Sequence, residues 1–451
     1  MSNYQLSVKS YPLYKDSAIA WLGDVPEHWE LKRLKDIIKN LESGVSVNAE
    51  NMPAQNDLYG VLKTSCVNEY GFNPNENKAI LPEEFTRVKC SPKKGRIIIS
   101  RMNTPELVGA SGYINEDYPN LFLPDRLWQT DFYSNSKLNS KWLSYLLLAS
   151  SLKGVISCSA TGSSPSMKNL AQEDFLRIEI PIPRLSEQKL IAAYLDTKTA
   201  QCDRKIDLLT QKATQYGKLK QSLINETVIR GLDKSVPMKD SGVEWIGDVP
   251  EHWQLKRLKD IGTSIIGITY APEDALGDKT SGLLVLRSSN IQNGRLSLSD
   301  TVYVNKKVNP RQIVKKGDIL ICSRNGSRAL IGKNICIDER TEGQTFGAFM
   351  TVYRSKYFRF ISKFFNSNVF ESQSGLFGSS TINQLTVNTL NNFLLILPPL
   401  SEQKAIADYL DKKTAQIDQI IQTINTQIEK LKELRKTLIN DVVTGKIKVI
   451  E

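Results

Sequence analysis

The chain contains two copies of one unit. Residues 21–38 read WLGDVPEHWELKRLKDII and residues 245–262 read WIGDVPEHWQLKRLKDIG, so 15 of 18 positions are identical at an offset of 224. A second pair, LSEQKLIAAYLD at 185–196 and LSEQKAIADYLD at 400–411, matches at 10 of 12 positions at an offset of 215. We call the first pair the framing segments and the second pair the LSEQK segments. Chance does not supply such matches, and the pattern predicts two copies of one structural unit.

The interiors of the two copies have diverged. Across residues 39–184 and 263–399, identity falls to short echoes such as KKGRIIISR at 93–101 and KKGDILICSR at 315–324. Nearly identical frames around diverged interiors favour one scaffold that presents two different binding surfaces. Neutral drift after duplication is the weaker alternative, because drift would blur the frames as well.

Each LSEQK segment opens a predicted long helix. Gly and Pro are nearly absent from 186–230 and 401–444, and apolar residues recur at helical spacing. Ser186 and Ser401 follow Pro-containing turns and are predicted N-caps. About 35 helical residues span roughly 50 Å. The two helices can therefore act as a spacer.

Both predicted helices carry an apolar seam. In the second helix it steps by 4, 3, 4, 3, which suits one partner helix, through Ile417, Ile421, Ile424, Ile428 and Leu431. A looser series in the first helix comprises Ile206, Leu209, Ala213, Tyr216, Leu219 and Leu223. Each seam needs a mate, and the other copy is the nearest. Antiparallel pairing would relate the two units by an approximate two-fold axis.

The diverged interiors mix short β-rich runs, such as 96–100, 319–323 and 335–337, with turns and short helices such as 141–151. The sequence therefore predicts an α+β protein with two α+β domains separated by two long antiparallel helices. The expected division is a first domain over 1–184, a central helix over 185–235, a second domain over 236–399 and a C-terminal helix over 400–451.

Composition limits the function classes. A chain of 451 residues exceeds one ordinary core, and Lys plus Arg outnumber Asp plus Glu by 59 to 48, which favours a polyanionic partner over a merely basic protein. Six scattered cysteines include no Cys-x-x-Cys pair, so they predict buried, reduced thiols and neither a zinc site nor a disulfide framework. There is no run of 18 apolar residues and no signal peptide, so we expect a cytoplasmic protein without membrane contact.

Catalytic motifs are missing from the sequence. It has no phosphate loop, no dinucleotide-binding glycine pattern, no Asn/Asp-Pro-Pro-Tyr methylation motif and no acidic cluster with lysine for a nuclease metal. The two histidines, His28 and His252, occupy the same place in the two framing segments. That duplication favours packing or hydrogen bonding over catalysis. We therefore predict no catalytic residue and no metal site in this chain.

The motifs WxGDVPEHWxLKRLKD and LSEQKxIAxYLD, each present twice and in alternation with diverged domains, resemble the specificity subunit of type I restriction-modification enzymes. The resemblance extends over essentially the whole chain. It implies a non-catalytic protein whose two target-recognition domains each read one half of a split, asymmetric site in double-stranded DNA, while the helices fix the unread gap. It also implies assembly with two methyltransferase subunits and two ATP-driven translocase-endonuclease subunits. S-adenosylmethionine, ATP and Mg²⁺ would then be bound by those partners and none by this chain.

Corresponding loops in the two copies supply candidate DNA contacts. Basic and small polar residues can contact phosphates or base edges, Arg suits guanine and Asn suits adenine. The candidates are Lys63, Ser65, Arg101, Asn103, Thr161, Ser163, Ser164 and Lys168 in the first copy, and Arg287, Ser289, Asn290, Arg324, Asn325, Ser379, Ser380 and Thr381 in the second. Ordinary solvated loops are an equally good interpretation of 61–65 and 285–290. Lys32, Arg33 and Lys35, and their repeats, form a basic run that is usually a solvated helix face.

Symmetry suggests a methyltransferase interface at the helix starts, at Glu187, Gln188, Glu402 and Gln403. Two other function classes remain open at this point. One is a coiled-coil scaffold that binds only proteins, and the other is an unfamiliar nuclease or methylase that acts alone. The duplication adds a prediction: a chain ending near residue 235 should dimerise and, with a methyltransferase, direct methylation to a palindromic split site.

Overall fold

The computed structural model describes residues 9–55, 58–164, 167–276, 282–292, 294–375 and 384–449. The chain forms two compact units. Unit 1 comprises Met1–Leu209 and Thr426–Glu451, and unit 2 comprises Thr210–Asn425. The division cuts through both long helices, α4 (Leu185–Arg230) and α9 (Leu400–Val443), so each unit holds one variable interior and part of each helix. The sequence-based division instead kept each helix as a separate segment.

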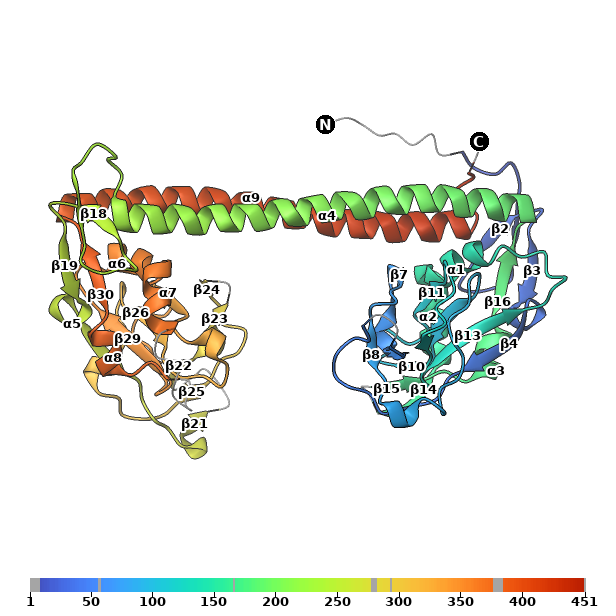
Figure 1. Ribbon diagram of the computed structural model, residues 1–451, viewed down its shortest axis with the longest axis horizontal. Helices are drawn as coiled ribbons and strands as arrows, with labels where there is room; N and C mark the ends of the chain where they lie inside the picture. Colours follow the sequence, from blue (N-terminus) through green and yellow to red (C-terminus); the bar gives the residue numbers. More distant parts are fainter. Residues whose placement is uncertain are drawn as a thin grey trace. The chain divides into compact units, whose positions relative to one another are not determined.

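Unit 1 is an α+β domain around a four-stranded antiparallel sheet (Figure 1). The order in this sheet is β11 (Ser111–Tyr113), β9 (Ile97–Ser100), β13 (Leu127–Phe132) and β4 (Ile38–Ser43). A second sheet joins β12 (Leu121–Phe122), β5 (Gly60–Leu62) and β8 (Asn77–Ala79). A third joins β10 (Met102–Asn103), β15 (Met167–Asn169) and β14 (Thr161–Ser164).

Unit 2 repeats the first two sheets in the same order. The four-stranded sheet runs β27 (Asn334–Cys336), β26 (Ile319–Cys322), β29 (Met350–Arg354) and β20 (Thr263–Ile266). The second sheet joins β28 (Thr345–Phe346), β22 (Leu283–Leu286), β25 (Tyr303–Val304) and β21 (Ala275–Leu276). In both units the second sheet contains one parallel pair, β12 with β5 and β28 with β22. The diverged interiors therefore share the order of the four-stranded sheet and this parallel pair, although the second sheet of unit 2 has one more strand and the β10–β15–β14 sheet has no counterpart among the described residues of unit 2.

Shorter pairs complete both units. In unit 1 they are β1 (Tyr14–Asp16) with β2 (Asp24–Pro26), β3 (Glu30–Arg33) with β16 (Glu179–Ile182), and β6 (Val67–Asn68) with β7 (Gly71–Phe72). In unit 2 they are β17 (Met238–Asp240) with β18 (Asp248–Pro250), β19 (Gln254–Arg257) with β30 (Leu394–Leu397), and β23 (Ile291–Gln292) with β24 (Arg295–Leu296). Each framing segment thus pairs with the strand just before its LSEQK segment.

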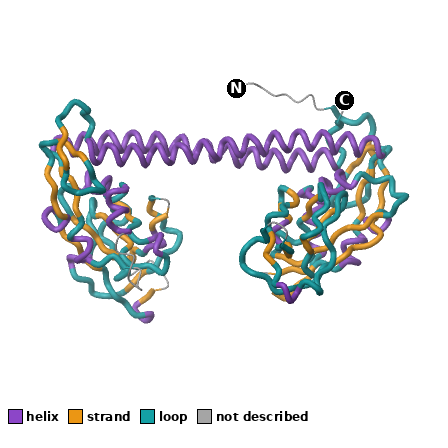
Figure 2. The backbone as a smooth tube through the Cα atoms, in the orientation of Figure 1, coloured by secondary structure: helices purple, strands orange, loops and turns teal. Residues whose placement is uncertain are grey.

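Helix within the domains is short, whereas the long pair is continuous (Figure 2). The short α-helices are α1 (Ser140–Leu148), α2 (Ser150–Ser159), α3 (Gln172–Arg177), α5 (Leu258–Ile261), α6 (Phe358–Phe364), α7 (Asn368–Gly375) and α8 (Val387–Asn391). The 3-10 turns are η1 (Leu34–Asp36), η2 (Thr64–Cys66), η3 (Pro82–Glu84), η4 (Pro272–Asp274), η5 (Ser288–Asn290), η6 (Pro310–Gln312) and η7 (Arg328–Leu330). Within the described ranges, no helix is both long enough and apolar enough to cross a membrane.

The long helices confirm the sequence pattern with two corrections. They begin at Leu185 and Leu400, so Ser186 and Ser401 lie in the first turn and are not N-caps. In the α9 seam Ile417, Ile424 and Ile428 are buried. In α4, however, Leu219 is exposed, because the buried face passes through Ile224 and Val228 instead.

Ion pairs show that the helices run antiparallel within each unit. In unit 1 Asp203 of α4 pairs with Arg435 of α9, at 2.9 Å between Oδ1 and Nε. In unit 2 Lys220 of α4 pairs with Asp418 of α9, at 2.7 Å. The second pair lies later in α4 and equally far earlier in α9, as antiparallel pairing requires. Asp203 and Asp418 are equivalent positions of the repeat, as are Lys220 and Arg435, so the two ion pairs are copies of each other.

Each framing segment holds one end of both long helices. In unit 1 Trp29 is fully buried, donates from Nε1 to Glu187 at the start of α4 (3.2 Å), and packs near Gly445 after the end of α9. In unit 2 Trp253 donates to Glu402 at the start of α9 (2.9 Å) and packs against Gly231 after the end of α4. Gly231 and Gly445 have φ of 74° and 79°, which favours glycine at these helix ends.

A second attachment joins each variable domain to the far end of a long helix. Asn440 of α9 accepts from the backbone N–H of Ser151 (3.2 Å) and the Ser151 hydroxyl (2.8 Å), at the start of α2. Asn225 of α4 accepts from the backbone N–H of Asn368 (2.8 Å), at the start of α7. The two asparagines are equivalent positions of the repeat, each within the shared tripeptide LIN. The repeat therefore also fixes each domain against the helix pair.

Candidate nucleic-acid interface

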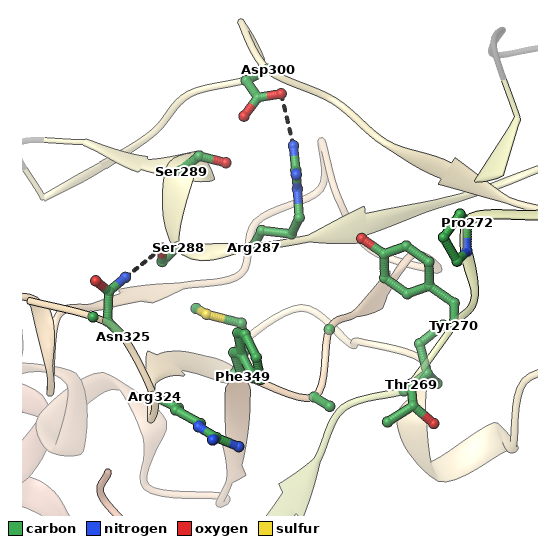
Figure 3. Close-up of a pocket in the computed structure, with 15 residues that line it drawn as sticks. Thr269, Tyr270, Pro272, Arg287, Ser288, Ser289, Asp300, Arg324, Asn325 and Phe349 are labelled. Atoms are coloured by element: carbon green, nitrogen blue, oxygen red, sulfur yellow. Dashed lines mark hydrogen bonds and ion pairs between the residues drawn. The ribbon is translucent and has the colours of Figure 1, made fainter. Parts of the chain in front are cut away.

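In unit 2, several predicted contact residues line one open pocket of about 1030 Å³ (Figure 3). The pocket lies where strands β22 and β26 end and where the turn before β29 returns. Four of its lining residues were predicted from the sequence, namely Arg287, Ser289, Arg324 and Asn325. The structure thus brings together two loops that are well separated in the sequence.

One wall of this pocket is organised by Arg287. Its Nη2 donates to Asp300 Oδ1 at 2.7 Å, and Figure 3 shows this ion pair among the lining residues. The Arg287 Nε and the Ser289 hydroxyl are buried and have no hydrogen-bond partner among the described residues. A ligand could therefore pair with these atoms only if a side-chain movement exposed them, but it would not have to break an existing hydrogen bond.

Asn290 does not belong to this surface. It is 0% exposed, accepts from the Arg287 backbone N–H (2.8 Å), and donates to the carbonyls of Ser297 (3.0 Å) and Asp300 (2.7 Å). These bonds use its amide to close the η5 turn. The prediction of a base contact by Asn290 therefore needs correction, because its side chain is buried and already bonded.

The opposite wall is formed by Arg324, Asn325 and Phe349. The Arg324 guanidinium lies 5.1 Å from the centre of the Phe349 ring, a cation–π arrangement. Asn325 donates to the Ser288 hydroxyl at 3.1 Å, which holds the two loops together. Just behind them, burial raises the pKa of the Cys322 thiol, so this sulfur stays protonated at neutral pH.

Unit 1 repeats the first wall with different side chains. In the register of the framing segments, Lys63 and Ser65 correspond to Arg287 and Ser289, and Glu76 corresponds to Asp300. Ser65 donates to Glu76 at 2.6 Å, and the Lys63 ammonium lies 3.7 Å from the same carboxylate. The hydrogen bond from Ser65, aided by the charge of Lys63, lowers the pKa of Glu76. Each domain therefore keeps a cation beside a carboxylate at this place.

The other predicted contact residues of unit 1 lie on or beside the β10–β15–β14 sheet. Met102 and Asn103 pair with Asn169 and Lys168, and Thr161 of β14 pairs with Asn169. This brings the predicted loop at 160–170 beside Arg101 and Asn103. Asn103 is partly committed, because it donates to the Ser100 hydroxyl at 3.2 Å.

The remaining second-loop candidates are only partly placed. Ser163 and Ser164 lie on β14, whereas Ser379, Ser380 and Thr381 lie outside the described residues. In unit 2 the end of the corresponding loop lies beside Arg324, just after β26, since Gln384 forms a β-bridge with Arg324. In the framing segments Lys32 pairs with Glu30 (2.8 Å) and Arg33 with Glu179 (3.3 Å). A phosphate contact by this basic run stays a prediction.

The predicted interface at the helix starts is largely internal. Gln188 and Gln403 are buried, and their side chains donate to the carbonyls of Pro183 (2.8 Å) and Pro398 (2.7 Å). A partner subunit cannot reach them, which corrects the prediction for these two glutamines. Glu187 and Glu402 accept from the framing tryptophans and remain partly exposed.

The histidines have the hydrogen-bonding role predicted for them. His28 bonds to Glu187 (2.9 Å) and His252 to Glu402 (2.7 Å).

All six cysteines are free, but only Cys66 and Cys322 are buried and Cys158 is exposed, contrary to the expectation that all are buried. Among the described residues, no group of three or more His, Cys, Asp or Glu is arranged to hold a metal ion.

Sequence reasoning missed the aromatic side of the unit 2 pocket and its counterpart in unit 1. Tyr270 and Phe349 line the pocket, and Phe349 precedes β29. The corresponding residue of unit 1 is Arg126, because Arg101 N donates to Arg126 O (3.0 Å) as Arg324 N donates to Phe349 O (3.0 Å). No repeated letters mark this position, so only strand pairing could reveal it.

Together these features define a class: a protein with two related, polar and cationic surfaces on one duplicated helical frame. The family model for the type I restriction modification DNA specificity domain matches residues 26–215 and again residues 250–430. The chain belongs to this family of type I restriction-modification DNA specificity proteins.

Two curated relatives carry the same description. The chain is 25% identical over 442 residues to the type I restriction enzyme MjaVIII specificity subunit of Methanocaldococcus jannaschii, covering 94% of each chain. It is 32% identical over 207 residues to the type I restriction enzyme EcoKI specificity subunit of Escherichia coli, covering 45% of this chain and 44% of that one. These matches do not favour the protein-only scaffold or a nuclease that acts alone.

Solved structures share the fold. A chain from a study of complex assembly and conformational transition of the type I R-M system superposes with a TM-score of 0.70 at 16% identity, covering 94% of this chain and 99% of that one. The HsdS subunit from Thermoanaerobacter tengcongensis gives a TM-score of 0.50 at 16% identity, covering 94% and 98%. The α+β fold with two domains and long helices is therefore shown.

Proposed function

We propose that the two domains read the two halves of one bipartite, asymmetric site in double-stranded DNA, and that the α4–α9 pair sets the unread gap. The observation that carries this proposal is the double match of a DNA specificity domain in one chain, with corresponding surfaces that differ in their side chains. Two linked readers combine their contacts in one complex, whereas a single reader has few bases to discriminate.

Within each domain, the arginine after the central strand is the proposed base reader, Arg101 in unit 1 and Arg324 in unit 2. Arginine can donate two parallel hydrogen bonds to guanine O6 and N7. Lys63 and Arg287 each form an ion pair with a carboxylate. Either side chain would have to leave that carboxylate before it could contact a phosphate or a base. Lys168, on β15 beside Asn103, supplies a phosphate contact in unit 1.

The reactions are assigned to partners. The proposed complex contains two methyltransferase subunits and two translocase-endonuclease subunits, which bind S-adenosylmethionine, ATP and Mg²⁺, and it acts in the cytoplasm. A repeated surface supports two equivalent partner sites: Leu219 and Leu434 are equivalent positions of the repeat and are 54% and 53% exposed. Large apolar side chains exposed on a helix favour a protein partner when they recur at equivalent positions.

The DNA-binding proposal is tested by titrating labelled duplex at several salt concentrations. The logarithm of the binding constant should fall linearly with the logarithm of salt, with a slope of about 0.9 per phosphate contact. Methylated positions produced by the chain with its methyltransferase should then map to two sequence blocks separated by a fixed gap. A salt-independent interaction, or modification without a common sequence, contradicts the proposal.

The partner sites are tested with Leu219→Asp and Leu434→Asp. Each charge should block one site, so sedimentation or native mass spectrometry should find one methyltransferase subunit per chain instead of two. The double variant should bind none. Leu208→Ala, at an exposed apolar position of α4 whose repeat counterpart is Thr423, is the control and should keep two subunits.

A further inference from the structure

Residues 126 and 349 occupy the same place in the two domains. In both units the backbone carbonyl at this position accepts from the N–H of the reader arginine, Arg101 or Arg324, at 3.0 Å. The strand pairs agree, because Phe122 pairs with Val61 where Thr345 pairs with Val285. Continuing equally far along the chain from Phe122 and from Thr345 gives Arg126 and Phe349. The duplication thus placed two chemically opposite side chains at one structural position.

Phe349 is a large aromatic residue that the domain does not bury. It is 59% exposed, although it sits in a pocket with Arg287, Ser289 and Asn325. A single exposed aromatic residue is common on protein surfaces. Here, however, the ring lines a concave site beside arginine and hydroxyl side chains, where it can offer an apolar face to a ligand.

The ring also prepares Arg324. The guanidinium rests 5.1 Å from the ring centre, and it makes no ion pair or hydrogen bond with a described residue. Figure 3 shows Arg324 beside Phe349 and apart from Asp300, which is bonded to Arg287. A cation held by a ring keeps its planar set of donors available for two parallel bonds to one acceptor edge.

DNA offers one apolar group at a base edge, the methyl group of thymine in the major groove, and guanine offers the two acceptors that suit arginine. We infer that Phe349 contacts a thymine methyl group next to a guanine bound by Arg324, and that Arg126 replaces this thymine contact with a second cationic contact in the half-site of unit 1. This inference rests on the proposed function. Residue 126/349 would then be a specificity-determining position for the two half-sites.

The experiment uses the full chain in complex with its methyltransferase and the DNA site mapped by methylation. Each thymine of both half-sites is replaced in turn by uracil, which lacks only the methyl group. Loss of one apolar methyl contact should weaken binding by the wild-type complex about fourfold at one thymine, in one half-site only. In Phe349→Ala the same replacement should cause no further loss.

Two further variants separate the contact from a general weakening. Phe349→Leu keeps an apolar side chain but lacks the ring, so it should retain the uracil effect while discriminating less well at the neighbouring guanine. Leu255→Ala, exposed and outside the pocket, should behave as wild type. Sequence-specific binding with no thymine whose uracil effect disappears in Phe349→Ala overturns the inference alone. Absence of any sequence-specific binding overturns the proposed function and the inference together.

Discussion

Units 1 and 2 share the contacts that join the framing segments to the long helices, but they differ where a long helix meets the variable domain. The ion pairs Asp203–Arg435 and Lys220–Asp418 are copies of each other, yet among the described residues only the cation of the first makes further contacts with a variable domain. Arg435 Nη1 donates to the carbonyl of Glu69 at 3.0 Å, and its guanidinium lies 5.1 Å from the Tyr70 ring. Its neighbour Lys436 pairs with Glu69 at 2.7 Å. In unit 1 a spacer-helix cation has therefore become an anchor for the turn between β6 and β7.

After the duplication, the contacts that position the domains stayed the same, whereas the residues of the candidate DNA-contact surfaces diverged. Trp29 and Trp253, Glu187 and Glu402, and Asn225 and Asn440 make equivalent contacts in both units. Position 126/349 holds a cation in unit 1 and an aromatic ring in unit 2. A diverging reader on a constant frame can change half-site specificity without loss of the fold.

The largest expected effect comes from removing a framing tryptophan. Trp29→Ala or Trp253→Ala deletes a fully buried side chain between the ends of both long helices, which should cost about 3–5 kcal/mol. If the units are independent, hydrogen exchange should increase mainly in the unit that carries the substitution. Equal loss of protection in both units from either variant would show that the frame is one cooperative structure.

Much of this frame was predictable from the sequence because its signals are local. Repeated letters revealed the duplication, and the near absence of Gly and Pro over 401–444 indicated α9, which the structure places at Leu400–Val443; the predicted C-terminal segment over 400–451 ran past the end of this helix. The same letters misassigned Gln188 and Gln403, because a repeat cannot distinguish an internal hydrogen bond from an interface. Leu219 was wrongly assigned to the buried face of α4, because apolar residues at a spacing of three and four do not show which face of a helix packs against its partner.

The site was less predictable because it depends on long-range strand pairing. Arg287 and Arg324 were predicted from their residue types, and the structure places both in the lining of the pocket. Phe349 and Arg126 have no matching neighbours in the sequence, and only the strand pairing and backbone hydrogen bonds of the structure relate them. Asn290 looked like a base reader, but its three hydrogen bonds close a turn.

The second prediction concerns the anchor that distinguishes unit 1. Arg435→Ala should destabilise the region around β6 and β7 by about 2–3 kcal/mol, because it removes a buried cation with a carbonyl, a ring and a carboxylate as partners. Hydrogen exchange of residues 67–72 should therefore accelerate while strands of unit 2 keep their protection. No change at these residues would mean that the hairpin is held by the rest of the domain.

A third prediction compares the two reader arginines. Arg324→Ala and Arg101→Ala should each lower the affinity for the mapped site roughly tenfold to a hundredfold, and each should relax discrimination at a guanine in a different half-site. Competition binding with single-base variants of the duplex measures this. Uniform weakening on all sequences would instead identify phosphate contacts, which carry no base information.

The smallest effect is expected at the copy of the anchor in unit 2. Lys220 is 31% exposed and pairs with Asp418, so Lys220→Ala should cost under about 1 kcal/mol, and the cost should shrink at high salt. Chemical denaturation measures the loss of stability, and amide hydrogen exchange of residues 210–230 measures its local effect. Arg435→Ala is measured in parallel. Lys220→Arg should remain close to wild type, since it keeps the charge. If Lys220→Ala is as damaging as Arg435→Ala, the contacts of Arg435 with Glu69 and Tyr70 add no stability, and the asymmetry between the two units would be confined to their pockets.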